Sequence, residues 1–251
     1  MKNTERQDQI AEYVQQQGYV TFAELKARFG YSDMTLRNDL KTLDAQNRII
    51  RVHGGAKSAQ TVVRSDDLFF TRSIRHADKK REIARKAQAL VQPNMSIFMD
   101  CGTTTMELCR KFPDVPCFIV TNSISSILEL AHLKNPSVMM LGGQLNRYNL
   151  CVDSLRNQPN LEKMNFDIMF LAVTGFTMEN GFTCGTEVED ILRQTVMHRS
   201  GKVVALMDSS KVGQVYAVTY AGFSDVDVVI SDSALDPETA AAFRSHGVEV
   251  L

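Results

Sequence analysis

Apolar residues recur at helical spacing in three short segments at the start of the chain. The first covers residues 4–17 and stops before Gly18, a residue type that commonly ends helices. Thr21 and Glu24 have the spacing of a capping box, in which each side chain satisfies the other residue's backbone amide at the start of a helix. The pattern therefore predicts a second helix after Thr21 that ends at Gly30.

Residues 32–43 predict a third helix, with Ser32 as its cap and a polar face opposite an apolar one. The residues expected to face inward are Met34, Leu36, Leu40 and Leu43. Those left outward or flanking are Thr35, Arg37, Asn38, Lys41 and Thr42. Two helices joined by a turn of about four residues that contains glycine are typical of a helix-turn-helix.

The polar face of this third helix favours DNA as its partner. Thr35, Arg37 and Asn38 lie near the helix N-terminus, where a recognition helix in the major groove contacts base edges. Lys41 is better placed for a phosphate contact. We expect Asp39 to have a structural role, because an acid that faced phosphate would be repelled. Two alternatives stay open at this stage: an ordinary three-helix bundle with a solvated basic face, and a head that contacts protein.

Residues 49–56 alternate apolar and basic side chains and run into Gly54 and Gly55. This pattern predicts a strand and a turn, the wing of a winged helix, with Arg51 and His53 beside the DNA backbone or the minor groove. The complete set of expected DNA contacts is Ser32, Thr35, Arg37, Asn38, Lys41, Arg51 and His53.

From residue 76 onward, short apolar runs alternate with helical segments. The apolar runs predict strands at 95–99, 117–121, 138–141, 167–173, 203–207, 226–230 and 248–251. The helical segments are 78–91, 106–111, 123–133, 188–197 and 237–246. Such alternation is typical of a mostly parallel α/β sheet. The expected organisation is a head at 1–57, a linker at 58–75 that can end in a short docking segment, and an α/β domain at 76–251.

Small polar residues follow five of these predicted strands. In an open α/β sheet, ligands bind beyond the carboxyl ends of the strands. Asp100 follows the first strand, and Gly102 with three threonines then opens a helix, an arrangement suited to an anion. The expected ligand-binding residues are Lys80, Asp100, Gly102, Thr103, Thr104, Thr105, Asn122, Ser123, Gly142, Gly143, Thr174, Gly175, Glu187 and Lys211. Ordinary turns use the same residue types, but together the five strand ends predict a pocket for a small, phosphorylated, polyhydroxylated ligand.

Composition narrows the class of protein. The chain is 44% hydrophobic and 23% charged, which suits a folded protein with a sizeable core. Residues 1–57 hold nine Lys and Arg against seven Asp and Glu, whereas the remainder holds 19 against 22. This weak asymmetry favours a head that faces nucleic acid. Five cysteines without paired spacing indicate reduced thiols rather than a disulfide framework or a metal site.

Several classes of function are not expected. The first eight residues are polar, unlike a signal peptide, and no apolar run approaches the roughly 20 residues of a membrane span, so we expect a cytoplasmic protein. No motif calls for a cofactor or a metal ion. No nucleophile is paired with a base at a strand end, which argues against an enzyme. The alternative is a sugar-phosphate isomerase with an N-terminal appendage, in which Glu187 or its neighbours Glu189 and Asp190 would act as base.

Six motifs run through the head and the body in a fixed order. They are SDMTLR at 32–37, RVHGGA at 51–56, FMDCGTTT at 98–105, VTNS at 120–123, LGG at 141–143 and DSSKVG at 208–213. This ordered set resembles the DeoR family of bacterial transcriptional regulators. The resemblance implies a winged helix-turn-helix followed by a sensor domain akin to ribose-5-phosphate isomerase and CoA-transferase folds. It also implies that residues 102–105 hold phosphate and that Lys211 reaches the ligand.

Three positions depart from the family pattern. Asn38 stands where a second arginine is common, Arg193 where lysine is common, and Thr174 where aspartate is common. The resemblance implies a repressor of a carbohydrate-utilisation operon whose operator binding is controlled by a sugar phosphate. Its partners would be double-stranded operator DNA and further copies of the chain, as a homodimer or homotetramer.

Overall fold

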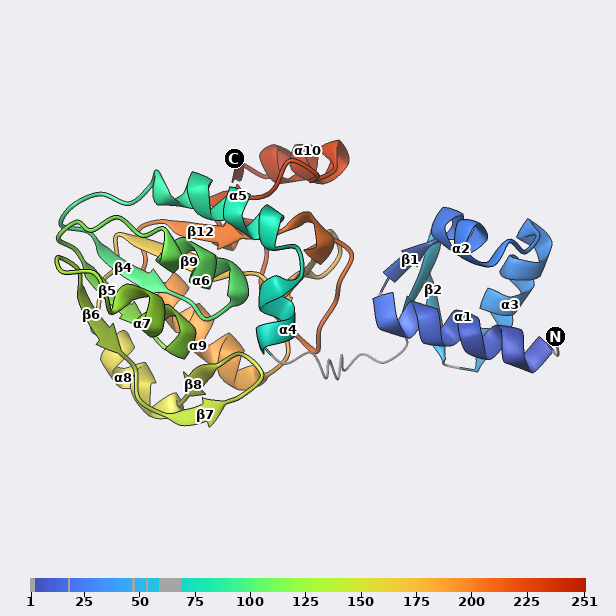
Figure 1. Ribbon diagram of the computed structural model, residues 1–251, viewed down its shortest axis with the longest axis horizontal. Coiled ribbons are helices and arrows are strands. Elements are labelled where there is room, and N and C mark those ends of the chain that lie inside the picture. Colours follow the sequence, from blue (N-terminus) through green and yellow to red (C-terminus); the bar gives the residue numbers. More distant parts are fainter. Residues whose placement is uncertain (1–2, 18, 47, 53, 59–68) are drawn as a thin grey trace. The chain divides into compact units, whose positions relative to one another are not determined.

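The computed structural model describes residues 3–17, 19–46, 48–52, 54–58 and 69–251 (Figure 1). The chain divides into two compact units, Met1–Arg64 and Ser65–Leu251. The first holds helices and a small sheet, and the second is a layered α/β unit. The predicted fold class, a winged helix-turn-helix followed by an α/β domain, is confirmed.

The N-terminal unit packs three helices against a three-stranded antiparallel sheet. Its elements are α1 (Asn3–Gln17), β1 (Tyr19–Thr21), α2 (Phe22–Phe29), α3 (Asp33–Ala45), β2 (Ile49–Val52) and β3 (Gly55–Ser58). The strands pair in the order β1-β3-β2, so β2 and β3 form the predicted wing and β1 extends it. Leu25, Leu36 and Leu43 are fully buried in the shared core of the unit.

The helix ends follow the sequence signals. The backbone amide of Thr21 donates to Glu24 Oε2 (2.8 Å), and the amide of Glu24 donates to Thr21 Oγ1 (3.2 Å), which completes the capping box. Gly30 ends α2 in the left-handed conformation, with φ of 68°. Ser32 Oγ accepts from the amide of Thr35 (3.3 Å) at the start of α3. The turn between α2 and α3 is therefore fixed at both sides.

One prediction about α3 is wrong. Met34 was expected to face inward, but its side chain is 71% exposed. Leu36, Leu40 and Leu43 do face the core. Met34 lies two residues before Leu36, which is about 200° around a helix, so both residues cannot share one face. The exposed face of α3 thus begins with an apolar side chain.

Asp39 has the structural role that the sequence suggested. Its carboxylate accepts hydrogen bonds from Arg6 Nε (2.6 Å), Arg6 Nη2 (2.9 Å) and Gln7 Nε2 (2.9 Å), all from α1. Burial disfavours the charged carboxylate, but these hydrogen bonds outweigh it and lower the pKa of Asp39. The ion pair therefore ties the inner side of α3 to α1.

The C-terminal unit is built on a seven-stranded sheet in the order β15-β14-β12-β9-β4-β5-β6, with every pair parallel. Its helices are α4 (Phe69–Ile74), α5 (Ala77–Gln88), α6 (Thr103–Arg110), α7 (Ile124–Leu130), α8 (Gln158–Leu161), α9 (Glu187–Met197) and α10 (Pro237–Ser245). Its strands are β4 (Ser96–Met99), β5 (Phe118–Thr121), β6 (Ser137–Met140), β7 (Gln144–Asn146), β8 (Cys151–Asp153), β9 (Ile168–Ala172), β10 (Gly175–Thr177), β11 (Gly181–Cys184), β12 (Val203–Leu206), β13 (Val218–Ala221), β14 (Val228–Ile230) and β15 (Glu249–Val250). Short 3-10 turns lie at Leu155–Asn157, Ser209–Lys211 and Phe223–Asp225.

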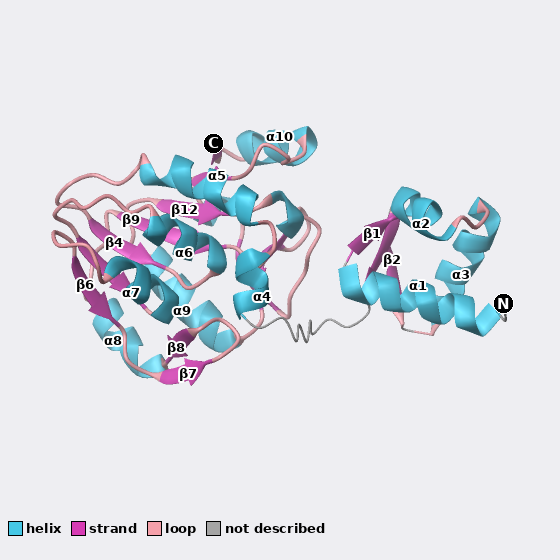
Figure 2. Ribbon diagram, in the orientation of Figure 1, coloured by secondary structure: helices cyan, strands magenta, loops and turns pink. Residues whose placement is uncertain are grey.

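Both faces of the large sheet are buried. Ile97 and Met99 of β4 belong to a core with α5 and α6, and α5, α6 and α7 cover this face (Figure 1). Phe98, which points the other way, belongs to a second core with α9 and α10. Figure 2 shows the strands as a layer between the helices. Successive side chains of a strand alternate between faces, so a run such as residues 168–172 must be apolar at every position.

Two features of this unit were not predicted. A second sheet, β10-β11-β13, packs on the α9 side, and the hairpin β7-β8 follows β6. α4 lies at the end of the segment 58–75, where the sequence allowed for a short docking segment. Phe69 of α4 is 2% exposed, so this helix is part of the C-terminal unit.

Candidate functional site

The strand order brings the five polar strand ends together. β6, β5, β4, β9 and β12 are consecutive neighbours and run parallel, so their carboxyl ends lie side by side along one edge of the sheet. The sequence identified each end separately but could not show that they are adjacent. Ligands of open α/β sheets bind at this edge.

The loop after β4 is shaped by a close approach of the backbone to β9. A side chain at Gly102 would place its Cβ 2.6 Å from Cβ of Ala172, closer than real contacts allow. α6 then begins at Thr103, and no side chain caps its first amides. Thr103, Thr104 and Thr105 are all buried, and Thr105 Oγ1 donates to the carbonyl of Gly102 (3.0 Å). Uncapped amides at a helix N-terminus favour an anion.

A buried ion-pair network lies beside this loop. Arg193 of α9 is 2% exposed; its Nε lies 3.0 Å from Asp100 Oδ2, and its Nη1 lies 3.5 Å from Glu189 Oε2. Burial disfavours the charged guanidinium, but Asp100, Tyr220 and Glu189 together outweigh this effect, and the pKa of Arg193 is raised. Burial also raises the pKa of Glu189. The two carboxylates are therefore held around one arginine.

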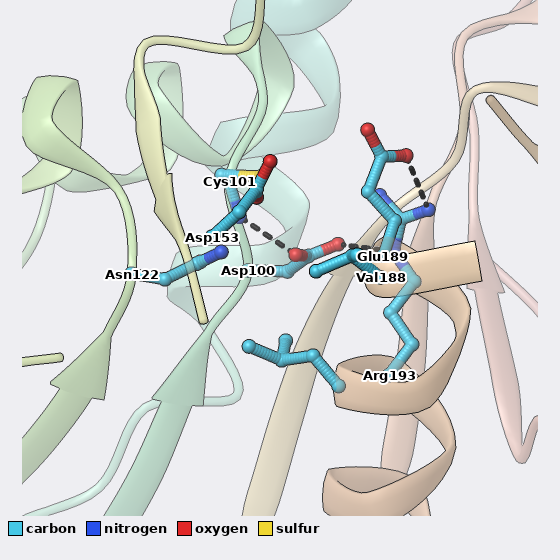
Figure 3. Close-up of a pocket in the computed structure, with 8 residues that line it drawn as sticks. Asp100, Cys101, Asn122, Asp153, Val188, Glu189 and Arg193 are labelled. Atoms are coloured by element: carbon cyan, nitrogen blue, oxygen red, sulfur yellow. Dashed lines mark hydrogen bonds and ion pairs between the residues drawn. The ribbon is translucent and has the colours of Figure 1, made fainter. Parts of the chain in front are cut away.

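A small pocket opens against this network (Figure 3). Its lining residues come from the ends of β4, β5 and β8 and from α9, namely Asp100, Cys101, Asn122, Asp153, Val188, Glu189, Leu192 and Arg193. Asn122 is 4% exposed, and its Oδ1 has no hydrogen-bond partner among the residues that the structure describes. A buried acceptor without a partner is costly, so a ligand hydroxyl or amine there would satisfy it.

The pocket wall is connected to α4 through one asparagine. Nδ2 of Asn149 donates to Glu189 Oε1 (2.7 Å), and Oδ1 of Asn149 accepts from Arg72 Nη2 (2.9 Å). The Arg72 guanidinium also donates to the carbonyl of Tyr148 and lies over the Tyr148 ring, 4.1 Å from its centroid. Arg72 belongs to α4, the first helix of the C-terminal unit.

Lys80 reaches α4 from α5 rather than standing free. Its ammonium donates to the backbone carbonyls of Arg72 and Arg75. Burial lowers the pKa of Lys80 to about 8, and Asp208 and Lys211, at the end of β12, are close enough to influence it. Lys80 does not line the pocket of Figure 3, and its expected role in ligand binding stays a prediction.

The remaining predicted ligand residues occupy varied positions. Ser123 is fully buried and caps α7 through Ser126, while Gly142 and Gly143 are exposed after β6. Thr174 and Lys211 are half-buried, and Gly175 begins β10. Glu187 is exposed in the first turn of α9 and does not line the pocket of Figure 3; the buried acid of that turn is Glu189.

Three residues at or beside the pocket were not identified from the sequence: Cys101, Asn149 and Asp153. Glu189 was named only as a neighbour of Glu187, and Arg193 only as a departure from the family pattern. Glu189 and Arg193 are four residues apart on α9, a spacing that places two side chains together on a helix. That signal was present in the sequence. Asn149 and Asp153 flank or end β8, whose hairpin the sequence did not predict.

The exposed face of α3 forms the other candidate site. Arg37, Asn38 and Lys41 are exposed there, and Ser32 is exposed at its start. The Arg37 guanidinium lies over the Phe22 ring, 5.0 Å from its centroid, which orients it. Thr35 is half-buried, and Arg51 of β2 is exposed. His53 lies outside the described residues.

No helix in the part of the chain that the structure describes is both long enough and apolar enough to cross a membrane. No group of three or more His, Cys, Asp or Glu side chains there is arranged to hold a metal ion.

Two family models match the chain. The DeoR-like helix-turn-helix domain matches residues 6–62, and the DeoR C terminal sensor domain matches residues 75–233. These regions correspond to the two compact units.

Curated proteins match along nearly the whole length. The HTH-type transcriptional regulator GlpR of Haloferax volcanii is 32% identical over 100% of this chain and 98% of its own length. The uncharacterized HTH-type transcriptional regulator YulB of Bacillus subtilis is 31% identical, with 98% of this chain and 95% of its own length covered. A putative aga operon transcriptional repressor of Escherichia coli O157:H7 is 29% identical, with 99% and 93% covered.

Solved structures match part of the chain. Ribose 5-phosphate isomerase A of Methanocaldococcus jannaschii aligns with a TM-score of 0.40 at 17% identity and covers 54% of each chain. The eIF2B beta subunit of Chaetomium thermophilum aligns with a TM-score of 0.47 at 11% identity, over 68% of this chain and 54% of its own.

Proposed function

Because the chain belongs to the DeoR family of transcriptional regulators, we propose that it represses a carbohydrate-utilisation operon and that a phosphorylated sugar controls its operator binding. The sugar phosphate binds in the C-terminal unit, at the carboxyl edge of the sheet. α3 of the N-terminal unit binds the operator. The name of the Escherichia coli relative, a putative aga operon repressor, supports the repressor role.

The observation that carries the ligand proposal is that an anion-binding helix N-terminus and a pocket lined by oxygen acceptors lie at the same edge of the sheet. The uncapped N-terminus of α6, beside three threonines, suits a phosphate. The neighbouring pocket presents oxygen acceptors from Asp100, Asn122, Asp153 and Glu189, which suit sugar hydroxyls and would repel phosphate. A ligand with a phosphate at one end and hydroxyls at the other satisfies both parts.

The signal reaches the chain that leads to the DNA-binding unit through α4. A ligand hydroxyl that competes for Glu189 changes the hydrogen bond to Asn149, and Asn149 also holds Arg72 of α4. Two identical heads are required to contact two half-sites, so the regulator acts as a homodimer or homotetramer in the cytoplasm.

A thermal-shift titration tests the ligand proposal. The full chain is heated with phosphorylated sugars of three to six carbons, each paired with its unphosphorylated sugar. At about 100 times the Kd, a ligand adds about 2.7 kcal/mol, which corresponds to a rise in Tm of roughly 5–10 °C for a unit of this size. Thr104→Val should reduce this shift, whereas Thr219→Val, on the exposed side of β13, should not. Equal responses to phosphorylated and unphosphorylated sugars would overturn the proposal.

The second candidate function is a sugar-phosphate isomerase with Glu189 as base, favoured by the raised pKa of that residue in the pocket. Both carboxylate oxygens of Glu189 are already engaged, by Asn149 and by Arg193, which disfavours proton transfer. Turnover of pentose or amino-sugar phosphates that is lost in Glu189→Gln or Glu187→Gln would establish the enzyme instead.

A further inference from the structure

Met34 is an apolar side chain on an otherwise polar helix face. It is 71% exposed, and among the described side chains of the N-terminal unit it is the one large hydrophobic group that stands out in solvent. It lies three, four and seven residues before Arg37, Asn38 and Lys41, all exposed. These spacings place the four residues in one stripe along α3.

The polar groups around Met34 are held by their own contacts. Ser32 Oγ and Thr35 Oγ1 lie 2.9 Å apart in a hydrogen bond, and Lys26 Nζ lies 2.7 Å from Asp33 Oδ1. Arg37 is oriented over Phe22. Met34 therefore projects between fixed neighbours, at the end of α3 that approaches base edges in a helix-turn-helix.

We propose that Met34 reads thymine by packing its thioether against the 5-methyl group in the major groove. The proposal rests on the proposed function, in which α3 binds the operator. Thymine is the base that presents a methyl group in the major groove, and apolar side chains contact it there. A flexible, polarizable thioether can follow the methyl position of either strand. Arg37 and Asn38 would then supply polar readout of guanine and adenine on the adjacent base pairs.

The test compares thymine with uracil, which differs only by the methyl group. Duplexes that bind the full chain are first enriched from a random pool. Each thymine of the enriched duplex is then replaced by deoxyuridine, and Kd is measured by fluorescence anisotropy for the wild type and for Met34→Ala. Met178→Ala, an exposed methionine of the C-terminal unit, is the matched control.

At one or two positions, loss of the methyl group should weaken wild-type and Met178→Ala binding about fourfold, the equivalent of one buried methyl group. At the same positions, loss of the methyl group should weaken the binding of Met34→Ala less than twofold. Equal losses in wild type and Met34→Ala, or no loss at any thymine, would show that Met34 does not read the methyl group while DNA binding stands. Failure to enrich any duplex would overturn the proposed function, and the Met34 assignment with it.

Discussion

Nδ2 of Asn149 donates a 2.7 Å hydrogen bond to Oε1 of Glu189, and this contact joins the wall of the ligand pocket to α4. The same asparagine accepts from Arg72, which α4 carries. Both ends of the side-chain amide are therefore used. A ligand that displaces the Glu189 carboxylate must therefore also disturb the hydrogen bond between Asn149 and Arg72 of α4.

Arg72→Met should uncouple the ligand from the operator. The substitution removes the donor to Asn149 but leaves every residue that lines the pocket in place. The thermal shift caused by the sugar phosphate should persist. The ratio of operator Kd values with and without the sugar phosphate should fall from about tenfold to less than threefold, a loss of coupling free energy of at least about 0.7 kcal/mol. Arg81→Met, in an exposed pair with Asp78, is the control and should keep the full ratio. An unchanged ratio of operator Kd values in Arg72→Met would show that α4 does not transmit the effect of the ligand.

Gly102→Ala should damage the phosphate loop. The new Cβ would lie 2.6 Å from Cβ of Ala172 on the adjacent strand, so β4 and β9 must shift, at a cost of about 1–3 kcal/mol in the free energy of unfolding. Gly222→Ala is the matched control, because its Cβ would make an ordinary 3.6 Å contact with Asp225 Oδ2. Urea unfolding of both variants measures the difference. Equal free energies of unfolding for the two variants would mean that the close approach of Gly102 to Ala172 does not exclude a side chain at this position.

Arg193→Met should destabilise the C-terminal unit strongly. The change leaves the carboxylates of Asp100 and Glu189 buried without their shared cation, and breaking a buried pair in this way costs about 3–5 kcal/mol. Arg85→Met, at an exposed position on α5, should change stability by less than about 0.5 kcal/mol. Equal urea unfolding midpoints for Arg193→Met and Arg85→Met would contradict the stabilising role of the ion-pair network.

Lys80 should make stability depend on pH in an alkaline window. Burial lowers its pKa from 10.5 to about 8 in the folded chain. Below pH 8 both states hold the charge and the folded state bears the cost of burying it; as pH rises from 8 towards 10.5 the unfolded state binds more protons, so this cost is relieved. Relative to Lys80→Met, wild-type stability should therefore rise by about 1 kcal/mol between pH 7.5 and 9.5. A constant difference between the two proteins across this range would rule out a lowered pKa.

The positions of the strand-end residues were predictable because their signals are local. Gly102 before three threonines and Asn122 before Ser123 each mark a strand that runs into a helix. Their adjacency was not predictable, because it depends on the strand order β6-β5-β4-β9-β12, which is set by packing between distant parts of the chain. The Asp100–Arg193 ion pair spans 93 residues for the same reason.

Two questions about helix faces have a different origin: which acid of the first turn of α9 faces the pocket, and why the inward placement of Met34 was wrong. Glu187, Glu189 and Asp190 all suit the start of α9 electrostatically, so the first-turn signal cannot tell which acid turns inward. The spacing of Glu189 from Arg193 would have distinguished it. For Met34, the geometry of the helix already excluded a shared face with Leu36. In both cases, helical periodicity identifies the side chain that faces inward, whereas residue type alone does not.

The central claim is that a sugar phosphate in the C-terminal unit controls operator binding by the N-terminal unit. The most direct measurement is the Kd of the full chain for its enriched duplex, by fluorescence anisotropy, with and without a sugar phosphate that raises Tm. We predict that saturating sugar phosphate weakens operator binding at least about tenfold, that the unphosphorylated sugar does not, and that operator DNA weakens sugar-phosphate binding by the same factor. A sugar phosphate that raises Tm but leaves the operator Kd unchanged would contradict the account.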